Sequence, residues 1–233
     1  MHSAFSIQHS ALFITGTDTG VGKSIVSAML ALMLLEQGKK IAISKPIQTG
    51  SNRDTDLLKE LTGNKIDIFN TYSFSLPSAP LVAARFEKKD INVEKIISDI
   101  KSLEEKYDCV IVEGIGGIAV PLIEPMNLQI KNHYLVADLI KALNYPTIIV
   151  ARPNLGTINH TVLTIEFAKQ KELNLLGFVI SGYDENTFDP AIKTAPEIIS
   201  DITEVKCMFK FAKVKEISYN SIVKSLATGQ YVC

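Results

Sequence analysis

The sequence predicts an α/β protein whose mostly parallel central sheet is covered by helices on both faces. Short apolar runs, typical of buried strands, alternate along the chain with segments of helical periodicity. A glycine-rich loop separates the first such run from the first helical segment. The 233 residues, 46% of them hydrophobic, are enough for a sizeable core. Since no linker or internal repeat divides the chain, we expect one domain over residues 1–233, with 1–10 as a loose extension.

The elements follow one another in strand–helix order. The first half is expected to contain a strand at 11–15, a helix from 25, a strand at 40–44 and helices at 54–62 and 93–106. The second half is expected to contain strands at 108–112, 147–151 and 175–180 and helices at 133–143 and 158–172. Beyond residue 184 the pattern weakens, with helices expected at 197–201 and 219–226 and a strand at 205–211. Parallel sheets of this kind bind ligands at the carboxyl ends of their strands.

The composition of the chain argues against several classes of protein. A formal net charge of −1 gives no basic field for nucleic acid, and no apolar run reaches the length of a membrane span. The first ten residues lack the pattern of a secretory signal. The three cysteines show no metal-binding spacing and cannot all pair, which favours a reducing compartment. We therefore expect a cytoplasmic protein with neither a nucleic-acid nor a membrane partner.

The loop after the first strand reads GTDTGVGKS over residues 16–24. A glycine-rich loop that ends in Gly-Lys-Ser before a helix is the layout of a phosphate-binding P-loop. Lys23 would reach the β- and γ-phosphates of a nucleotide, and the Ser24 hydroxyl would bind Mg²⁺. Gly16 stands one position earlier than the usual motif requires, so this loop is one residue longer. The predicted fold is accordingly a P-loop NTPase-like three-layer sandwich.

Two further motifs follow predicted strands. Lys45 opens KPIQTG at the end of the second strand, where it could polarise a carbonyl or neutralise charge during phosphoryl transfer. Glu113 lies in VEGIGG, at the tip of a buried strand where P-loop proteins hold Mg²⁺. Asp54 and Asp56 open a helix and offer a further oxygen ligand, although acids at a helix start are often only caps. The pattern alone leaves the role of Asp56 open.

A fourth motif, NLGTINH at residues 154–160, follows a strand and opens a helix. A helix N-terminus offers unpaired N–H groups and a partial positive charge, so the motif is a candidate anion site. His160 could act as a general base, but a packing or hydrogen-bonding role is more common for a histidine at a helix start.

Together these motifs resemble the dethiobiotin synthetase family of the biotin pathway. The resemblance extends from about residue 12 to 183 and rests on GTDTGVGKS, KPIQTG, the acid in RDTDLL, VEGIGG and LGTINH. It implies ATP-dependent carboxylation and ring closure of 7,8-diaminopelargonate with CO₂, supplied from bicarbonate. The route implied is a carbamate, its anhydride with phosphoric acid, and closure to dethiobiotin.

The resemblance also implies roles for individual residues. Lys23, Lys45 and Thr49 would be catalytic, and the Mg²⁺ ligands would be Ser24, Asp56 and Glu113. The implied nucleotide-binding residues are Thr19, Gly20, Val21, Gly22, Lys23, Ser24, Ile25, Glu113, Gly116 and Ser181. The implied substrate-binding residues are Thr19, Lys45, Thr49, Gly156, Thr157, Ile158 and Asn159. In this family the helix that begins near Thr157 comes from the partner subunit, so a homodimer with the substrate site at its interface is implied.

The chain departs from the family pattern in places, and two rival families remain open. Ser181 stands where some members carry an asparagine that contacts adenine, so we expect looser base selectivity. Partitioning or septum-site ATPases share the predicted sheet but usually carry a lysine at the position of Asp18. Amide-forming synthetases of the cobalamin pathway have a similar P-loop but usually continue into a glutaminase domain, whereas this sequence ends at Cys233.

Overall fold

A computed structural model describes residues 9–51, 53–125, 132–214, 216 and 218–227. Most of the extension proposed for residues 1–10 therefore lies outside the described residues, as does Cys233. Within the described ranges, none of the helices combines the length and the apolarity needed to cross a membrane. The assignment of the whole chain to one domain remains a prediction.

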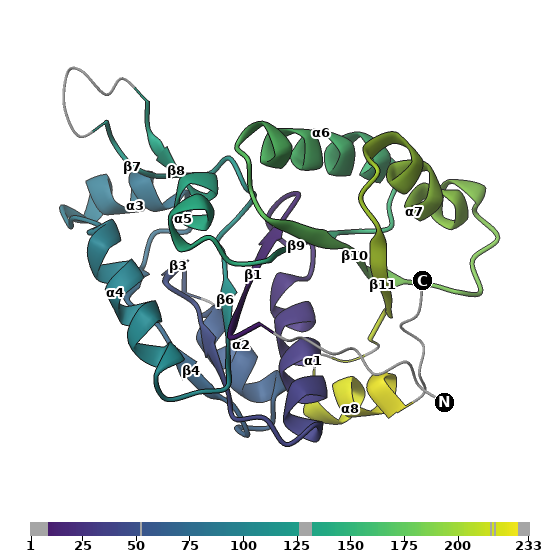
Figure 1. Ribbon diagram of the computed structural model, residues 1–233, viewed down its shortest axis with the longest axis horizontal. Helices are drawn as coiled ribbons and strands as arrows, with labels where there is room; N and C mark the ends of the chain where they lie inside the picture. The colour runs from purple at the N-terminus through teal and green to yellow at the C-terminus, as the bar shows by residue number, and fades with distance from the viewer. Residues whose placement is uncertain (1–8, 52, 126–131, 215, 217, 228–233) are drawn as a thin grey trace.

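The core of the fold is a seven-stranded parallel sheet with strand order β11-β10-β9-β1-β6-β2-β4 (Figure 1). Its strands are β1 (Ala11–Gly16), β2 (Ile41–Ser44), β4 (Asp67–Phe69), β6 (Cys109–Glu113), β9 (Thr147–Ala151), β10 (Leu175–Tyr183) and β11 (Cys207–Ala212). All residues of β1, β6 and β9 are buried, because helices cover both faces of these central strands. The predicted α/β class is confirmed.

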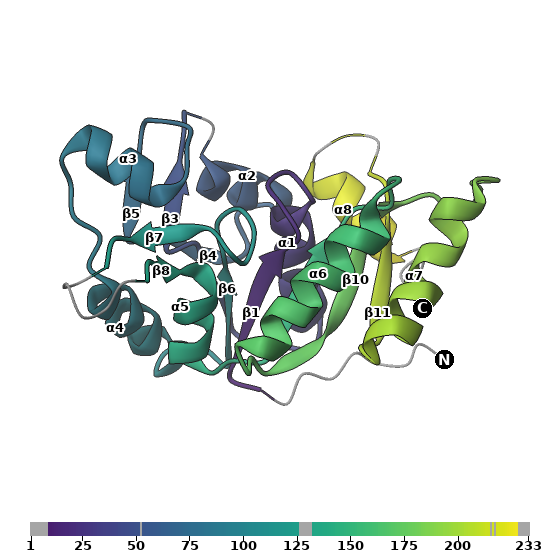
Figure 2. The same ribbon diagram turned by 90° about the horizontal axis from the view of Figure 1, so that it is seen from above.

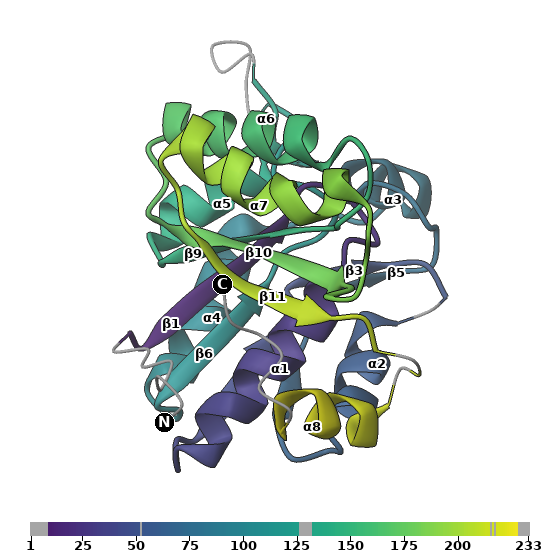
Figure 3. The same ribbon diagram turned by 90° about the vertical axis from the view of Figure 1, so that its right-hand side faces the viewer.

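Figure 3 shows α5, α6 and α7 on one side of the sheet and α1, α2 and α8 on the other. The first layer comprises α4 (Val93–Glu104), α5 (Val136–Leu143), α6 (Thr157–Gln170) and α7 (Pro190–Thr203), and the second comprises α1 (Lys23–Glu36), α2 (Asp54–Leu61) and α8 (Tyr219–Ala227). Two separate apolar clusters lie between these layers and the sheet. The molecule is thus the three-layer sandwich that the sequence predicts.

Two small sheets and one more helix extend the edge of the fold near β4. Figure 2 shows α3, β3 and β5 together on the side away from β11 and α7. The short strands are β3 (Ile47–Thr49), β5 (Tyr72–Phe74), β7 (Pro121–Ile123) and β8 (Tyr134–Leu135), and the helix is α3 (Pro80–Glu87). The strand-like residues 134–135 shorten the helix expected at 133–143, which begins at Val136.

The strand order brings three of the predicted motifs together. β1, β6 and β2 are consecutive in the sheet and parallel, so their carboxyl ends lie at one edge. Ile14 pairs with Glu113 and Ser44 pairs with Val112 in these ladders. The P-loop after β1, Lys45 after β2 and Glu113 at the end of β6 are therefore neighbours.

Candidate active site

The P-loop takes a tight path that two glycines make possible. A Cβ on Gly16 would lie 2.8 Å from Cγ2 of Val21, so the residue that ends β1 has no room for a side chain. Gly22 has a φ of 99°, in the left-handed region, and a Cβ there would lie 2.3 Å from Oγ of Ser181. This packing leads the chain directly into α1, whose N-terminus faces the edge where the motifs meet.

Lys23 is almost fully buried, and its ammonium group is held by the loop itself. Its Nζ donates hydrogen bonds to the carbonyl oxygens of Asp18, at 2.8 Å, and Gly116, at 2.6 Å. Burial, followed by repulsion from Lys45, lowers the pKa of Lys23 to about 8. A bound anion would raise this pKa and favour the charged form.

Glu113 joins the other two motifs through one oxygen atom. Its Oε1 accepts hydrogen bonds from the Ser24 hydroxyl, at 2.9 Å, and from Nζ of Lys45, at 2.8 Å. The second oxygen, Oε2, is buried and has no hydrogen-bond partner among the described residues. Buried carboxylate oxygens normally have a partner, so this atom marks a place for a cation or a donor.

Lys45 is 1% exposed and carries its charge into this cluster. Burial opposes the charged form, but the carboxylates of Glu113 and Asp54 outweigh it and raise the pKa of Lys45 above its ordinary value. Nζ lies 2.7 Å from Oδ2 of Asp54 and 2.9 Å from the carbonyl oxygen of Gly114. Lys45 therefore remains an ammonium group at neutral pH.

A cavity of 630 Å³ opens above this cluster. The predicted site residues that line it are Thr19, Gly20, Gly22, Lys23, Ser24, Ile25, Lys45, Thr49, Glu113 and Gly116. It is also lined by Asp54, which the sequence offers as an oxygen ligand, and by residues to which we assigned no role: Leu57, Pro77, Ser78, Ala79, Pro80, Ile115 and Val120. Pro77, Ser78 and Ala79 form the turn that leads into α3, and Pro80 is the first residue of that helix; the Ser-Ala-Pro pattern is their signal in the sequence.

Three of the predicted nucleotide-binding and metal-binding residues do not line this cavity. Asp56 is exposed, and it is Asp54 that contributes to the lining. Val21 is buried beneath the loop, so only its backbone could serve a nucleotide. Ser181 is buried against Gly22, where its hydroxyl occupies the space that a side chain at position 22 would need. The ligand roles assigned to these residues remain predictions.

The site suits an Mg²⁺ ion that shares its ligands with substrate phosphates better than a metal ion whose ligands all come from the protein. Among the described residues, no three histidine, cysteine or acidic side chains gather into a ready-made metal site. Mg²⁺ is commonly held by one or two carboxylates together with substrate phosphates. The unpartnered Oε2 of Glu113 and the adjacent Ser24 hydroxyl fit that donor set.

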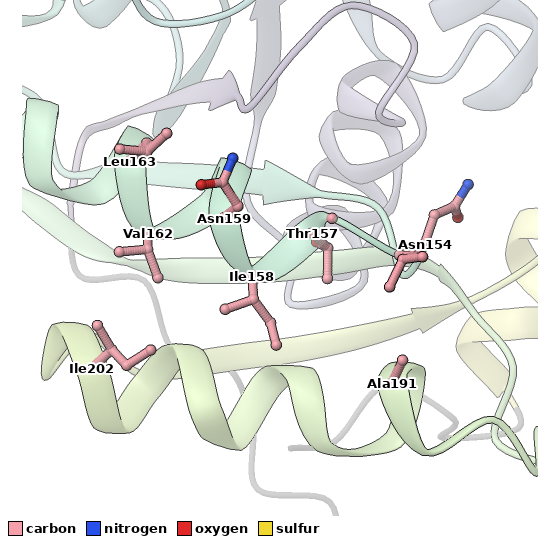
Figure 4. A pocket seen from close by; sticks show the side chains of 10 residues that line it. Asn154, Thr157, Ile158, Asn159, Val162, Leu163, Ala191 and Ile202 are labelled. Carbon is pink, nitrogen blue, oxygen red and sulfur yellow. The ribbon is translucent and has the colours of Figure 1, made fainter.

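The residues around the start of α6 lie in a different place. Gly156, Thr157, Ile158 and Asn159 line a groove of 480 Å³ between α6 and α7 (Figure 4). Apolar side chains dominate it, and Leu155 and Leu163 are 91% and 61% exposed. None of these residues lines the cavity above Glu113. Within one chain, the two predicted parts of the substrate site are therefore separate.

Comparison with known proteins identifies the family. A family model described as an AAA domain matches residues 10–224. An ATP-dependent dethiobiotin synthetase of Bacillus subtilis (strain 168) is 38% identical over 218 residues, which cover 91% of this chain and 90% of the relative. A protein of the same name from Methanocaldococcus jannaschii is 38% identical over 224 residues, 92% of this chain and 94% of the relative. This chain belongs to the dethiobiotin synthetase family.

Solved structures resemble the chain more distantly. The septum-site-determining protein MinD of Pyrococcus horikoshii, complexed with Mg-ADP, has a TM-score of 0.56 at 20% identity, covering 92% of this chain and 88% of that one. A ParA family ATPase of Chlorobium tepidum has a TM-score of 0.53 at 13% identity, covering 95% of this chain and 89% of that one. These likenesses confirm that this member of the dethiobiotin synthetase family has a P-loop fold. At such low identities they show nothing about its function.

The lowered pKa of Lys23 predicts a proton linkage to ATP binding. The anionic phosphates favour the ammonium form, so ATP binding above pH 8 should take up a proton, approaching about one at pH 9. The affinity for ATP should fall by about tenfold per pH unit above that pKa. Calorimetry of ATP binding in buffers of different ionisation enthalpy measures the uptake. A binding enthalpy that is independent of the buffer at pH 9 would contradict the prediction.

Proposed function

We propose that this chain is an ATP-dependent dethiobiotin synthetase that joins CO₂ to 7,8-diaminopelargonate and closes the cyclic urea. One observation carries the proposal: Ser24 of the P-loop and Lys45 both donate hydrogen bonds to Oε1 of Glu113. Lys45 is thus a second buried lysine beside the site, in addition to Lys23. A P-loop alone binds phosphate, whereas two lysines around one cavity can serve a nucleotide and a second anion. Relatives of the same name match over about nine-tenths of their length.

The P-loop binds the triphosphate. The N–H groups at the start of α1 and the ammonium group of Lys23 face the phosphates, and the dipole of α1 favours their negative charge. Lys23 exchanges its hydrogen bonds to the Asp18 and Gly116 carbonyls for bonds to phosphate oxygens. This exchange brings the charge of Lys23 to the γ-phosphate without uncovering its stem.

Lys45 serves the carbamate. One substrate amine adds to CO₂ and loses a proton, which produces a carbamate anion. A carbamate oxygen then attacks the γ-phosphorus and ADP leaves. Lys45 offsets the negative charge between the two reacting anions, and Thr49 and Thr19 supply hydroxyl groups from the cavity wall. The second amine attacks the carbonyl carbon and loses a proton, and phosphate leaves as the ring closes.

Mg²⁺ would be held by the Ser24 hydroxyl and Glu113, and the family pattern assigns a further oxygen ligand to Asp56. Asp54, the other acid that opens α2, lines the cavity beside Lys45, whereas Asp56 is exposed and does not line it. The ion would neutralise charge on the β- and γ-phosphates. The family pattern also assigns Ser181 to the nucleotide site, and its hydroxyl packs against Gly22 of the loop.

We also propose that the enzyme is a cytoplasmic homodimer in which the start of α6 completes the partner's substrate site. Diaminopelargonate carries its amines near one end and a carboxylate at the other. In one chain the start of α6 does not line the cavity that holds Lys45, so it suits the carboxylate of a substrate bound to a second copy. The exposed Leu155 and Leu163 give this face the apolar character of an interface.

ATP turnover that requires both diaminopelargonate and bicarbonate tests the proposed activity. Mass spectrometry should detect dethiobiotin only in the complete mixture. ATP turnover that does not depend on diaminopelargonate would contradict the proposal.

Glu113→Gln should raise the Mg²⁺ concentration needed for half-maximal ATP turnover by about tenfold or more. A neutral amide is a poorer ligand for a hard cation than a carboxylate. The matched control is Glu124→Gln, which removes an exposed carboxylate that pairs with Arg85. If the two variants need the same Mg²⁺ concentration, Glu113 is not a metal ligand.

Two inactive variants should restore activity when they form a mixed dimer. Lys45→Ala removes the ammonium group that faces the reacting end of the substrate in its own subunit. Thr157→Glu places a negative charge at the start of α6, where it repels the carboxylate of the substrate bound to the partner subunit. Because each mixed dimer keeps one intact site, random mixing should recover up to about a quarter of wild-type activity. Mass spectrometry of the intact dimers confirms mixing, and no recovery despite mixing would place the whole site in one chain.

A further inference from the structure

A short turn leads from β5 into α3 and forms part of the wall of the candidate active site. This entry turn comprises residues 75–79. Three of its residues line the 630 Å³ cavity above Glu113. Three line a second, more open hollow of 540 Å³ that is completed by the end of α3, and Pro77 belongs to both sets. Because the entry turn borders two hollows, packing supports it over only part of its surface, and its position depends on hydrogen bonds.

Glu87, the last residue of α3, supplies those hydrogen bonds. Its Oε1 accepts from the backbone N–H groups of Ser75, at 2.5 Å, and Leu76, at 3.2 Å. Lys89 donates to the other oxygen, Oε2, at 2.7 Å. The bond from Lys89 lowers the pKa of Glu87, and the two backbone bonds lower it further, so the carboxylate is charged at neutral pH. Hydrogen bonds to a charged acceptor are stronger than those between neutral groups.

The entry turn packs against the residue that follows Thr49. A Cβ on Gly50 would lie 3.3 Å from Cβ of Pro77, so the two backbones approach closely. Gly50 also has a φ of 93°, in the left-handed region that favours glycine. Since Thr49 is assigned to the substrate in the proposed reaction, the entry turn lies on the side of the cavity that would receive the second substrate, and it presents Pro77 and Ala79 there.

We propose that Glu87 is a positioning residue for the diamine. By holding the N–H groups of Ser75 and Leu76, it keeps the apolar side chains of the entry turn in the cavity wall, where they cover the hydrocarbon chain of the substrate. Glu87 does not line this cavity itself, so it acts through the entry turn. In naming the diamine, the inference rests on the proposed function, whereas the hold on the entry turn does not depend on any substrate.

Loss of Glu87 should weaken diamine binding more than it slows the chemical step. Without this acceptor, the two N–H groups bond to water, and the entry turn can shift toward either hollow. Lys23 and Lys45, which face the reacting groups, follow β1 and β2 and do not contact Glu87 through any hydrogen bond of the described residues. A contact that is made equally in the ground state and the transition state changes KM and leaves kcat unchanged.

Hydrogen exchange of the free protein tests the hold on the entry turn. In Glu87→Ala, the amides of Ser75 and Leu76 should exchange about fivefold faster or more, whereas those of α4 should keep their wild-type rates. Glu87→Gln keeps an acceptor oxygen and should restore most of the protection. The matched control is Lys89→Met, which breaks the exposed ion pair but leaves both backbone bonds, so its exchange rates should stay within about twofold of the wild type.

Steady-state kinetics of the same variants tests the effect on the substrate. Glu87→Ala should raise KM for diaminopelargonate by about fivefold or more, while kcat and KM for ATP stay within about twofold. Glu87→Gln and Lys89→Met should remain close to the wild type. Unchanged exchange or an unchanged KM for the diamine in Glu87→Ala, equal effects in Lys89→Met, or a parallel rise of KM for ATP would each overturn the inference. Failure of the proposed function would instead appear as absent diamine turnover in the wild type, and the exchange rates would still decide whether Glu87 holds the entry turn.

Discussion

The active site depends on one buried carboxylate oxygen. Oε1 of Glu113 accepts hydrogen bonds from both Ser24 and Lys45, and so ties the start of α1 and the end of β2 to the tip of β6. Both charged partners are 1% exposed, and because Lys45 has Asp54 as a second partner, it is the loss of Lys45 that would leave the Glu113 carboxylate uncompensated in the interior. Breaking such a pair typically costs about 3–5 kcal/mol. The cluster therefore fixes the relative positions of two motifs that lie far apart in the sequence.

The parallel sheet makes this cluster possible. Because β1, β6 and β2 are neighbours, residues that follow or end each strand meet at a single edge, although 89 residues separate Ser24 from Glu113. The ladders set the register, since Ile14 stands opposite Glu113 and Ser44 opposite Val112. A register shift of one residue would turn Glu113 to the other face of the sheet and away from Ser24. The strand register thus determines both the packing of the three-layer sandwich and the position of Glu113 in the site.

Sequence patterns recovered most of the sheet because its strands are continuous apolar runs, and β9 has the predicted bounds. They failed where local signals were weak. β3 and β5 are three residues long, too short for periodicity, and α7 is longer than predicted because Pro190 and Pro196 masked its helical pattern. In the site, sequence spacing could not tell which acid of α2 faces the cavity. That depends on where the helix starts after β3, and the start places Asp54 beside Lys45.

The fold alone does not determine the reaction. Proteins with names as different as MinD and a ParA family ATPase share this sheet at 13–20% identity. In this chain, a strand, a glycine loop and a helix N-terminus suffice to bind phosphate. Ring closure requires in addition a positive charge that faces the acceptor anion. In the proposed reaction Lys45 provides this charge from the end of β2, which is separated from β1 by β6, and its burial is tolerated because Glu113, Gly114 and Asp54 satisfy all three of its donors. The proposed chemistry therefore depends on a second lysine, at the end of the strand next to β6, in addition to the phosphate loop and Glu113.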